Sequence, residues 1–287
     1  ESAALGLPGF RTLMPGPANW LVPDWPAPGH VRAVFTTRGT SPRDGASAAP
    51  RDFFNLGDHV GDAPGAVAAN RAHLQASLGV RPVFLQQVHG TEVLEIDPAT
   101  PDGATADAAL MAAPGLACTI MVADCLAVLL TDAQGRAVAA AHAGWRGLAA
   151  GVLERTLERF RALVGAEYAG AATKKEAIEL IAWLSPCIGP RAFEVGPEVR
   201  QAFVDHSADA VACFAPAAGG KYLANLPALA RQRLAACGVH RVHGNDGGAA
   251  WCTVEQGGRY FSHRRDHARL GSSGRMAACV WLEGRAG

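Results

Sequence analysis

Apolar residues recur along the chain in short runs, and each run has the length of a strand rather than that of a helix. The strands that these runs predict lie at 31–37, 82–88, 116–122, 126–131, 137–141, 178–184 and 275–282. Turn-forming residues at 132–135 separate the fourth run from the fifth. We therefore expect this pair of strands to form a β-hairpin.

Apolar residues with helical spacing predict a second set of elements. One such stripe predicts a helix over 64–78, and Gly79 stands where its C-terminal cap belongs. The same spacing from Leu148 onward predicts one long amphipathic helix, which the chain enters through 144–147. Shorter helices are expected at 197–204 and 225–237.

The order of these elements favours an α+β fold, because strands and helices do not alternate regularly as they do in a doubly wound sheet. We expect a single domain of mixed β-sheets flanked by helices, formed by residues 31–287. Residues 1–30 are rich in proline and glycine and are expected to form an extended lead-in. The small, polar stretch 41–52 predicts a surface loop.

The amino-acid composition argues against nucleic acid and membranes as partners of this protein. The 287 residues include 26 Lys plus Arg and 26 Asp plus Glu, so no charge of one sign attracts nucleic acid or an anionic membrane. The seven cysteines follow no disulfide spacing, which favours the reducing cytoplasm. The first residues resemble no signal peptide, and no apolar run is long enough to span a bilayer. We expect a cytoplasmic protein that acts on a small molecule.

Three residues carry the sharpest chemical signal. Cys125 and His142 stand at the two ends of the predicted hairpin, and His89 ends the earlier apolar run LQQV. Thiolate and imidazole are ligands that a divalent metal such as zinc prefers, and three protein ligands leave a fourth position for water or substrate. No CxxC or HxxxH pair supplies two of these ligands from one turn, so the fold itself would have to assemble this site.

Each of these residues also has a structural interpretation. A free cysteine is commonly a buried core residue, and a histidine can be a satisfied core residue. The neighbours favour the functional interpretation. Asp124 precedes Cys125, either as a hydrogen-bond acceptor behind a metal ligand or as a strand-end polar group, and glycine-rich AGWRG follows His142. His59 is interpreted first as part of a turn, and His263 as part of a solvated cationic loop.

Arginines offer donors for a phosphate or carboxylate group. The candidates are Arg38, Arg71, Arg146 and Arg264, although a surface salt bridge is the commoner role for any single arginine. Signatures of dinucleotide-binding proteins, P-loop NTPases and α/β-hydrolases are absent from the sequence.

Eight motifs together resemble the YfiH family, which has also been called peptidoglycan editing factor and laccase-like polyphenol oxidase. They are FTTRG at 35–39, NLGDHVGD at 55–62, NR at 70–71, LQQVHG at 85–90, ADCLAVLL at 123–130, AAHAGWRG at 140–147, CIGPRAFEVG at 187–196 and FSHRRD at 261–266. The resemblance extends from about residue 31 to 282. It departs from the family pattern at Ala127, at 185–187 and at His263.

The resemblance implies a zinc protein of cysteine-hydrolase-like (CNF/YfiH-like) architecture that acts on purine nucleosides. The implied reactions are phosphorolysis of adenosine, inosine and methylthioadenosine, and deamination of adenosine. Carried onto this sequence, the zinc ligands are His89, Cys125 and His142, which are also the catalytic candidates together with Arg146. The candidates for phosphate and substrate are Asn55, Arg38, Arg71 and Arg264. We expect a monomer or a small homo-oligomer.

Three other functions remain open. A copper-dependent polyphenol oxidase would need several copper ions, and the sequence lacks HxH pairs of the kind that build a trinuclear cluster. A metal-free hydrolase would use Cys125 as nucleophile and His142 as base. A zinc-stabilised binding protein without catalytic activity is the third alternative.

Overall fold

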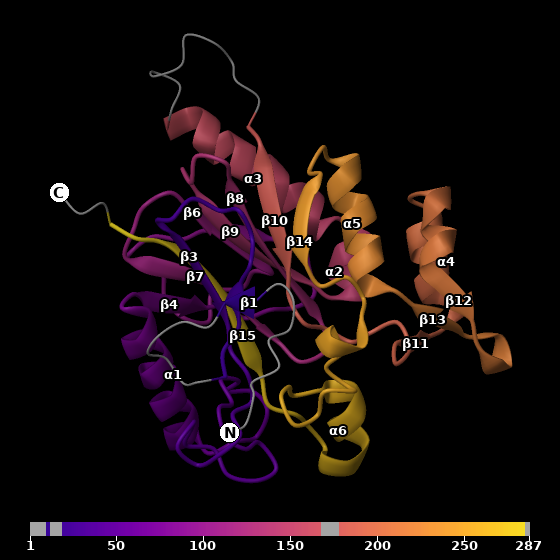
Figure 1. Cartoon of the computed structure of the whole chain (residues 1–287), viewed down its shortest axis with the longest axis horizontal. Coiled ribbons are helices and arrows are strands. Elements are labelled where there is room, and N and C mark those ends of the chain that lie inside the picture. Colours follow the sequence, from indigo (N-terminus) through magenta and orange to yellow (C-terminus); the bar gives the residue numbers. More distant parts are fainter. Residues whose placement is uncertain (1–9, 12–18, 168–177, 285–287) are drawn as a thin grey trace.

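Two β-sheets and a layer of helices form the body of the molecule (Figure 1). The computed structural model describes residues 10–11, 19–167 and 178–284. In spatial order the six-stranded sheet contains β14 (Arg241–Gly244), β10 (Leu180–Leu184), β8 (Leu126–Asp132), β9 (Val138–Ala143), β6 (Ala108–Met111) and β5 (Val93–Glu95). The four-stranded sheet contains β3 (Val31–Phe35), β15 (Met276–Leu282), β7 (Leu116–Val122) and β4 (Arg81–Phe84).

The six-stranded sheet is the middle layer and is buried on both faces. Leu129 of β8 belongs to the apolar cluster that the two sheets share. Its neighbours Val128 and Leu130 point the other way, into a second apolar cluster beneath the helices. This double burial explains why β8 is a continuous apolar run rather than an alternating one.

Helices cover the outer faces of the sheets. α3 (Val152–Glu167) packs on β9 and β6 and contacts α5 (Leu226–Ala236), whereas α1 (Pro64–Leu78) contacts β4 of the other sheet. None of the described helices is both long enough and apolar enough to cross a bilayer.

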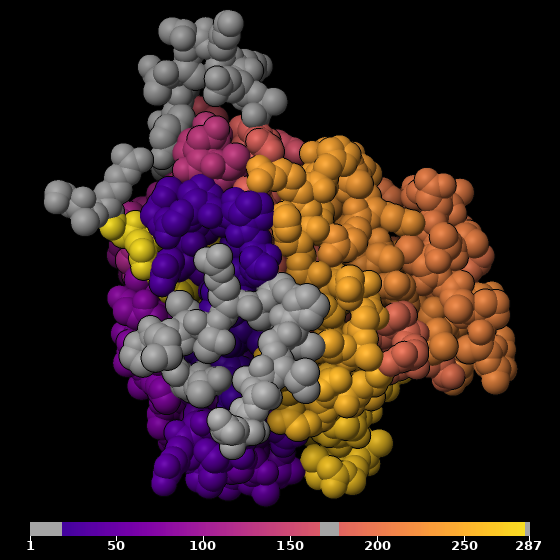
Figure 2. All heavy atoms as spheres, in the orientation of Figure 1, coloured from indigo at the N-terminus to yellow at the C-terminus, as the bar shows by residue number. Residues whose placement is uncertain are grey.

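Smaller elements lie at the edges. Figure 2 shows a projection at one side that contains α4 (Pro197–Val204) and a three-stranded sheet. That sheet contains β11 (Glu194–Val195), β13 (Tyr222–Ala224) and β12 (Phe214–Pro216). Two-residue strands β1 (Phe10–Arg11) and β2 (Val22–Pro23) pair with one another. Short 3₁₀ turns span Ala208–Cys213, Ala218–Gly220 and Ala249–Trp251.

Most elements expected from the sequence are confirmed. The helices at 64–78 and 197–204, the strand at 116–122 and the hairpin of β8 with β9 lie where the apolar pattern places them. Within the predicted lead-in, Trp20 and Leu21 are buried in the core, and Leu21 bridges to Phe35 of β3. The predicted boundary at residue 30 between an extended lead-in and the domain stays a prediction.

Three expectations were wrong. The long helix predicted from Leu148 is two helices, because Gly151 adopts φ 100° and ends α2 (Trp145–Ala150) before α3 begins. The strand predicted at 82–88 ends at Phe84, and a loop follows. The segment after Ser262 is not a loop but the helix α6 (His263–Leu270), because the Ser262 side chain caps it by accepting from the Arg265 amide.

Asn70 of α1 fixes the long loop before that helix, and its side chain is buried. Its Oδ1 accepts from the Ala46 amide at 2.7 Å, and its Nδ2 donates to Ser47 Oγ and to the carbonyl oxygens of Phe53 and Asn55. The side-chain amide of Asn70 therefore provides hydrogen-bond partners for several polar groups of the loop that are shielded from water.

We predict that Asn70→Ala lowers the free energy of unfolding by about 2–3 kcal/mol, because it leaves buried loop groups without partners. Urea denaturation measures the change. Gln75→Ala on the exposed face of the same helix is the control and should change stability by less than about 0.5 kcal/mol. Equal effects of the two variants would contradict the anchoring role of Asn70.

Candidate metal centre

The β8–β9 hairpin brings Cys125 and His142 together. The two strands pair antiparallel, with Ala127 opposite His142 and Leu126 opposite Ala143. Cys125 is the residue just before β8, so the beginning of one strand lies beside the end of the other. The pairing register alone therefore places a thiol next to an imidazole.

His89 reaches the same point from the loop after β4. Its Nε2 lies 3.8 Å from Cys125 Sγ, and its ring centroid lies 4.7 Å from that of His142. The candidate ligand atoms of the three residues all lie within 4.8 Å of one another. His89 has φ 60° and Asp124 has φ 83°, and among the described residues these are the non-glycine positions with positive φ. Such backbone conformations are concentrated at functional sites.

Asp107, which was not among the residues selected from the sequence, contacts both histidine segments. Its Oδ1 lies 2.9 Å from His142 Nδ1, and its two oxygens accept from the amides of Val88, His89 and Gly90 at 3.1, 2.9 and 2.7 Å. The side chain is completely buried. Hydrogen bonds from His142 and Gly90 lower the pKa of this carboxyl although burial opposes them, so the group is an anion.

Gly144 leaves room for the three side chains. A Cβ at this position would lie 2.9 Å from Cys125 Sγ, 3.1 Å from His89 Cδ2 and 3.5 Å from His142 Nε2. Its φ of −60° suits any residue, so the requirement for glycine is one of space. The first glycine of AGWRG therefore leaves the space that the three side chains occupy.

Charges within the cluster shift two pKa values in opposite directions. Burial opposes both shifts, but the mutual attraction of a thiolate and an imidazolium is stronger. It lowers the pKa of Cys125 to about 6 and raises the pKa of His142 to about 9, with the Asp107 carboxylate also favouring the charged imidazole. Without a metal, the pair is therefore a thiolate and an imidazolium near neutral pH.

The cluster opens into a cavity of about 880 Å³. Apolar side chains that include Phe84, Met121, Ile188 and Phe193 form part of its wall. Volume and lining are typical of a site for a small organic molecule.

Four arginines line this cavity, three of them sequence candidates. The Arg71 guanidinium lies over the Phe84 ring and pairs with Asp58 at 3.2 Å. Arg146 is exposed, and its guanidinium lies over the Trp145 ring without a polar partner in the described part of the chain. Arg264 donates to the carbonyl oxygens of residues 192 and 194.

Arg275 is the fourth, and it was not among the residues predicted from the sequence. Its Nη1 donates to the carbonyl oxygens of Ser273 and Gly274. Burial lowers the pKa of its guanidinium, and the nearby charges of Cys125 and Asp124 oppose that shift. An arginine stays cationic across the physiological range, so this charge faces the cavity beside the thiol. The sequence predicts that Arg275 begins a strand. It does not predict that this end of the strand lies at the cavity, which is why the residue could not be selected.

Two other sequence candidates lie outside the cavity lining. Arg38 donates to the carbonyl oxygens of Asp52 and Gly257 and lies over Phe261. Asn55 is fully buried: its amide donates to Gly57 O and Asp62 Oδ2, and its oxygen accepts from the amides of residues 57 and 275. Both side chains hold loops in place, and their assignment to phosphate and substrate stays a prediction.

The remaining candidates have mixed outcomes. His59 and His263 both line the cavity. His59 lies in a turn, as expected, whereas His263 begins the helix α6 instead of lying in a loop. Asp124 does not bind the metal-ligand candidates. Its carboxylate accepts from Thr253 Oγ1 at 2.5 Å and from the Arg264 amide at 2.6 Å, which ties the start of α6 to the residue before Cys125.

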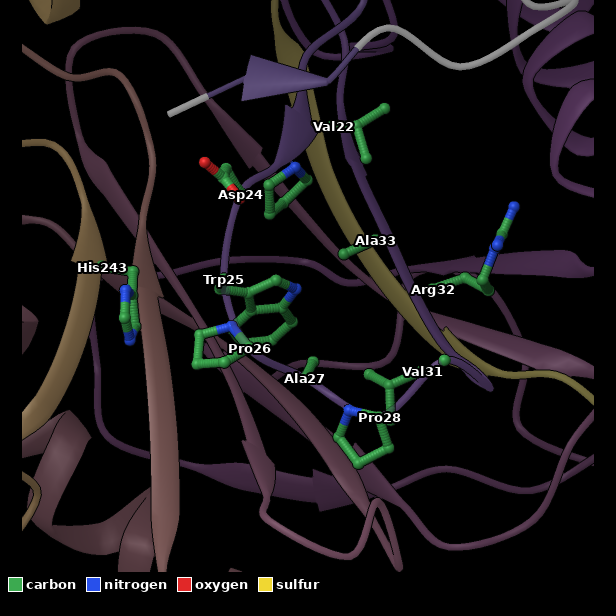
Figure 3. Close-up of a pocket in the computed structure, with 12 residues that line it drawn as sticks. Val22, Asp24, Trp25, Pro26, Ala27, Pro28, Val31, Arg32, Ala33 and His243 are labelled. Carbon is green, nitrogen blue, oxygen red and sulfur yellow. The ribbon is translucent and has the colours of Figure 1, made fainter. Parts of the chain in front are cut away.

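A second cavity, of about 600 Å³, lies between the segment 22–33 and β14. Figure 3 shows His243 on one side of it and Trp25 with Pro26 on the other. None of the residues selected from the sequence as catalytic or ligand-binding lines this cavity. The candidate chemistry therefore belongs to the cavity at the end of the β8–β9 hairpin.

Comparison with known proteins shows the family of this chain. The profile of the family described as "multi-copper polyphenol oxidoreductase laccase" matches residues 32–283. The chain belongs to this family. Among its relatives, a purine nucleoside phosphorylase of Pseudomonas aeruginosa is 49% identical over 265 residues, which cover 92% of this chain and 98% of that protein. The purine nucleoside phosphorylase YfiH of Escherichia coli is 46% identical over 264 residues, covering 91% and 98%.

Solved structures of the family share the fold. A crystal structure of a Neisseria meningitidis protein is 42% identical, with a TM-score of 0.79, and the match covers 93% of this chain and all of that one. The crystal structure of Bacillus licheniformis YfiH is 25% identical, with the same TM-score and coverage of 96% and 100%. These matches confirm the resemblance to YfiH proteins and the single mixed α/β domain.

We predict that Gly144→Ala weakens zinc binding at least about tenfold, because the added methyl group would overlap the Cys125 sulfur. Competition with a chromophoric chelator measures the affinity. Gly65→Ala is the control, since no atom lies within 4 Å of a Cβ at that position. Unchanged zinc affinity in the Gly144 variant would show that the three side chains do not bind the metal together.

We also predict that Cys125 is the reactive thiol of the chelator-treated protein. Its rate of alkylation by iodoacetamide should rise through a midpoint near pH 6, because the thiolate forms above that pKa, and should be constant by pH 8. Burial raises the pKa of Cys118, Cys187 and Cys279, so these should react little. Peptide mass mapping locates the label. A midpoint near pH 9 would contradict the thiolate–imidazolium pair.

Proposed function

We propose that this protein is a zinc-dependent purine nucleoside phosphorylase whose metal is held by His89, Cys125 and His142. The supporting observation is the meeting of these three residues with four arginines in one cavity. The names of the relatives support the same reaction. The reaction of a nucleoside with phosphate requires a bound anion, for which the arginines offer donors, and the three side chains offer a metal site beside it.

The three side chains fit zinc in both chemistry and spacing. Two imidazoles and one thiolate form a borderline-soft donor set, and zinc–nitrogen and zinc–sulfur bonds are about 2.0–2.3 Å long. Ligands of one tetrahedral ion are then roughly 3.5 Å apart, close to the 3.8 Å between Cys125 and His89. Zinc bound there would supply Lewis acidity and would lower the pKa of a coordinated water molecule.

The arginines of the cavity suit phosphate. In phosphorolysis a phosphate oxygen forms a bond to C1′ of the ribose while the bond from C1′ to the purine nitrogen breaks. Arg146 and Arg275 offer guanidinium donors to the anion, and Arg71 and Arg264 add positive charge along the wall. The chain would thereby hold phosphate beside a sugar that becomes cationic in the transition state.

The apolar part of the wall suits a purine ring. Phe84, Phe193 and Ile188 offer flat or aliphatic surfaces, and His59 and His263 offer ring nitrogens nearby. We propose adenosine, inosine and methylthioadenosine as substrates, together with deamination of adenosine at the same centre. We further propose that the protein acts in the cytoplasm as a monomer or a small homo-oligomer.

Copper-dependent oxidation of polyphenols is the second candidate, because the family description names it. A multi-copper centre needs several groups of ligands. In the described part of the chain, the grouping of His, Cys, Asp or Glu side chains that could hold an ion is His89, Cys125 and His142. One such group favours a single metal ion and therefore favours the phosphorylase.

The deciding experiment measures metal content and reaction products of the purified protein. We expect about one zinc ion per chain, and adenine with ribose 1-phosphate from adenosine only when phosphate is present. Inosine should appear without phosphate. Cys125→Ala and His142→Ala should lose zinc and both reactions by at least about a hundredfold, since metal stabilisation of a transition state amounts to several kcal/mol.

Cys237→Ala, just beyond the end of α5, is the control and should retain zinc and activity. Turnover by a zinc-free Cys125 or His142 variant would contradict the metal-dependent reaction. Copper with oxygen uptake on phenols would favour the oxidase instead. Covalent capture of a substrate fragment on Cys125 of metal-free protein would favour a Cys/His hydrolase.

A further inference from the structure

We infer that Asp107 is the positioning residue of this centre: one buried carboxylate holds His142 by its ring and His89 by its backbone, and so sets the distance between them. The inference rests on the proposed metal site. It concerns a residue that contacts neither the metal cavity nor a substrate, because Asp107 is absent from the cavity lining and is fully buried.

The first contact fixes which ring nitrogen of His142 faces the cluster. Nδ1 lies 2.9 Å from Asp107 Oδ1, and a carboxylate can only accept, so Nδ1 carries a proton and donates it. Nε2 therefore points toward Cys125 and is the nitrogen free to bind a metal. A hydrogen bond of this kind also makes the imidazole a stronger ligand.

The second contact fixes the backbone of the His89 loop. Three successive amides, those of Val88, His89 and Gly90, converge on the same carboxylate. They close a tight turn in which His89 adopts φ 60°, a conformation that costs energy for a residue with a side chain. The charge of Asp107 stabilises this turn, because each of these hydrogen bonds has an ionised acceptor.

The two contacts share an oxygen. Asp107 Oδ1 accepts both from the His142 ring and from the His89 amide, and Oδ2 accepts from the amides of Val88 and Gly90. Asp107 is itself fixed, because its carbonyl oxygen accepts from the His142 amide at 2.7 Å. The positions of the two histidines are therefore coupled before any metal binds.

The substitution Asp107→Asn replaces this carboxylate with an amide, which cannot make all four contacts. If the side-chain oxygen of the variant faced His142, the new NH₂ group would face the amide donors of Val88 and Gly90. If the side-chain amide were turned round, its NH₂ group would donate to Nδ1 of His142, and the proton would move to Nε2, where it blocks a metal. Either orientation should weaken zinc binding.

The test compares the zinc affinity of Asp107→Asn with that of Asp132→Asn. Asp132 is also a fully buried carboxylate of the six-stranded sheet, but it pairs with Arg136 at the other end of β8. Competition titration of the chelator-treated proteins should give a Kd for zinc that is roughly 10- to 100-fold weaker in Asp107→Asn. The Kd of Asp132→Asn should stay within about threefold of the wild type, although both variants lose stability.

A second variant keeps the test decisive if Asp107→Asn does not fold. Asp107→Glu retains the charge and all acceptor oxygens but displaces them by one methylene group. It should also lose at least about tenfold in zinc affinity, and faster hydrogen exchange at the amides of 88–90 should accompany that loss. Zinc affinity within about threefold of the wild type in the folded Asp107 variants would overturn the inference.

The proposed function and the positioning role of Asp107 can be contradicted separately. A wild-type protein that binds no zinc, or binds zinc and shows no phosphorolysis, would contradict the proposed function. A wild-type protein that does both while the Asp107 variants bind zinc equally well would contradict only the positioning role.

Discussion

The antiparallel register between β8 and β9 is the constraint on which the site depends. It sets Ala127 opposite His142, and the thiol one position before β8 then lies beside the imidazole. Both strands are buried on both faces, so sliding by one residue would exchange their side chains between the two apolar clusters and disrupt the close packing of both. The stability of the core and the geometry of the candidate metal centre are therefore maintained by the same hydrogen bonds.

Much of this arrangement can be predicted from the sequence because it is local. The hairpin follows from a turn signal between two apolar runs, and the triad follows from residue types at strand ends. Asp107 and Arg275 could not be predicted in the same way. Asp107 is one carboxylate in a stretch of small residues, and its role arises only because β6 pairs with β9. Arg275 reaches the cavity because β15 runs beside β7.

The errors have equally physical causes. Gly151 interrupts a helical apolar stripe without disturbing its periodicity, so spacing alone predicts one helix where there are two. Asn55 lies in a motif shared with the YfiH family, and its predicted contact with substrate stays untested. Its hydrogen bonds go to the loop and to the Arg275 amide. A residue can be required by a binding site because it holds the backbone behind that site.

The candidate metal ligands and Asp107 all come from residues 89–142, whereas Arg264 and Arg275 come from the C-terminal part of the chain and Arg71 comes from α1. These three cavity arginines are thus encoded outside the stretch that supplies the candidate ligands and Asp107, whereas Met121 of the wall lies within it. Substitutions at these three arginines therefore change the charge of the cavity and leave the candidate metal ligands unchanged, so selection can act on the two separately. Members of one family can in this way diverge in substrate without rebuilding their catalytic apparatus.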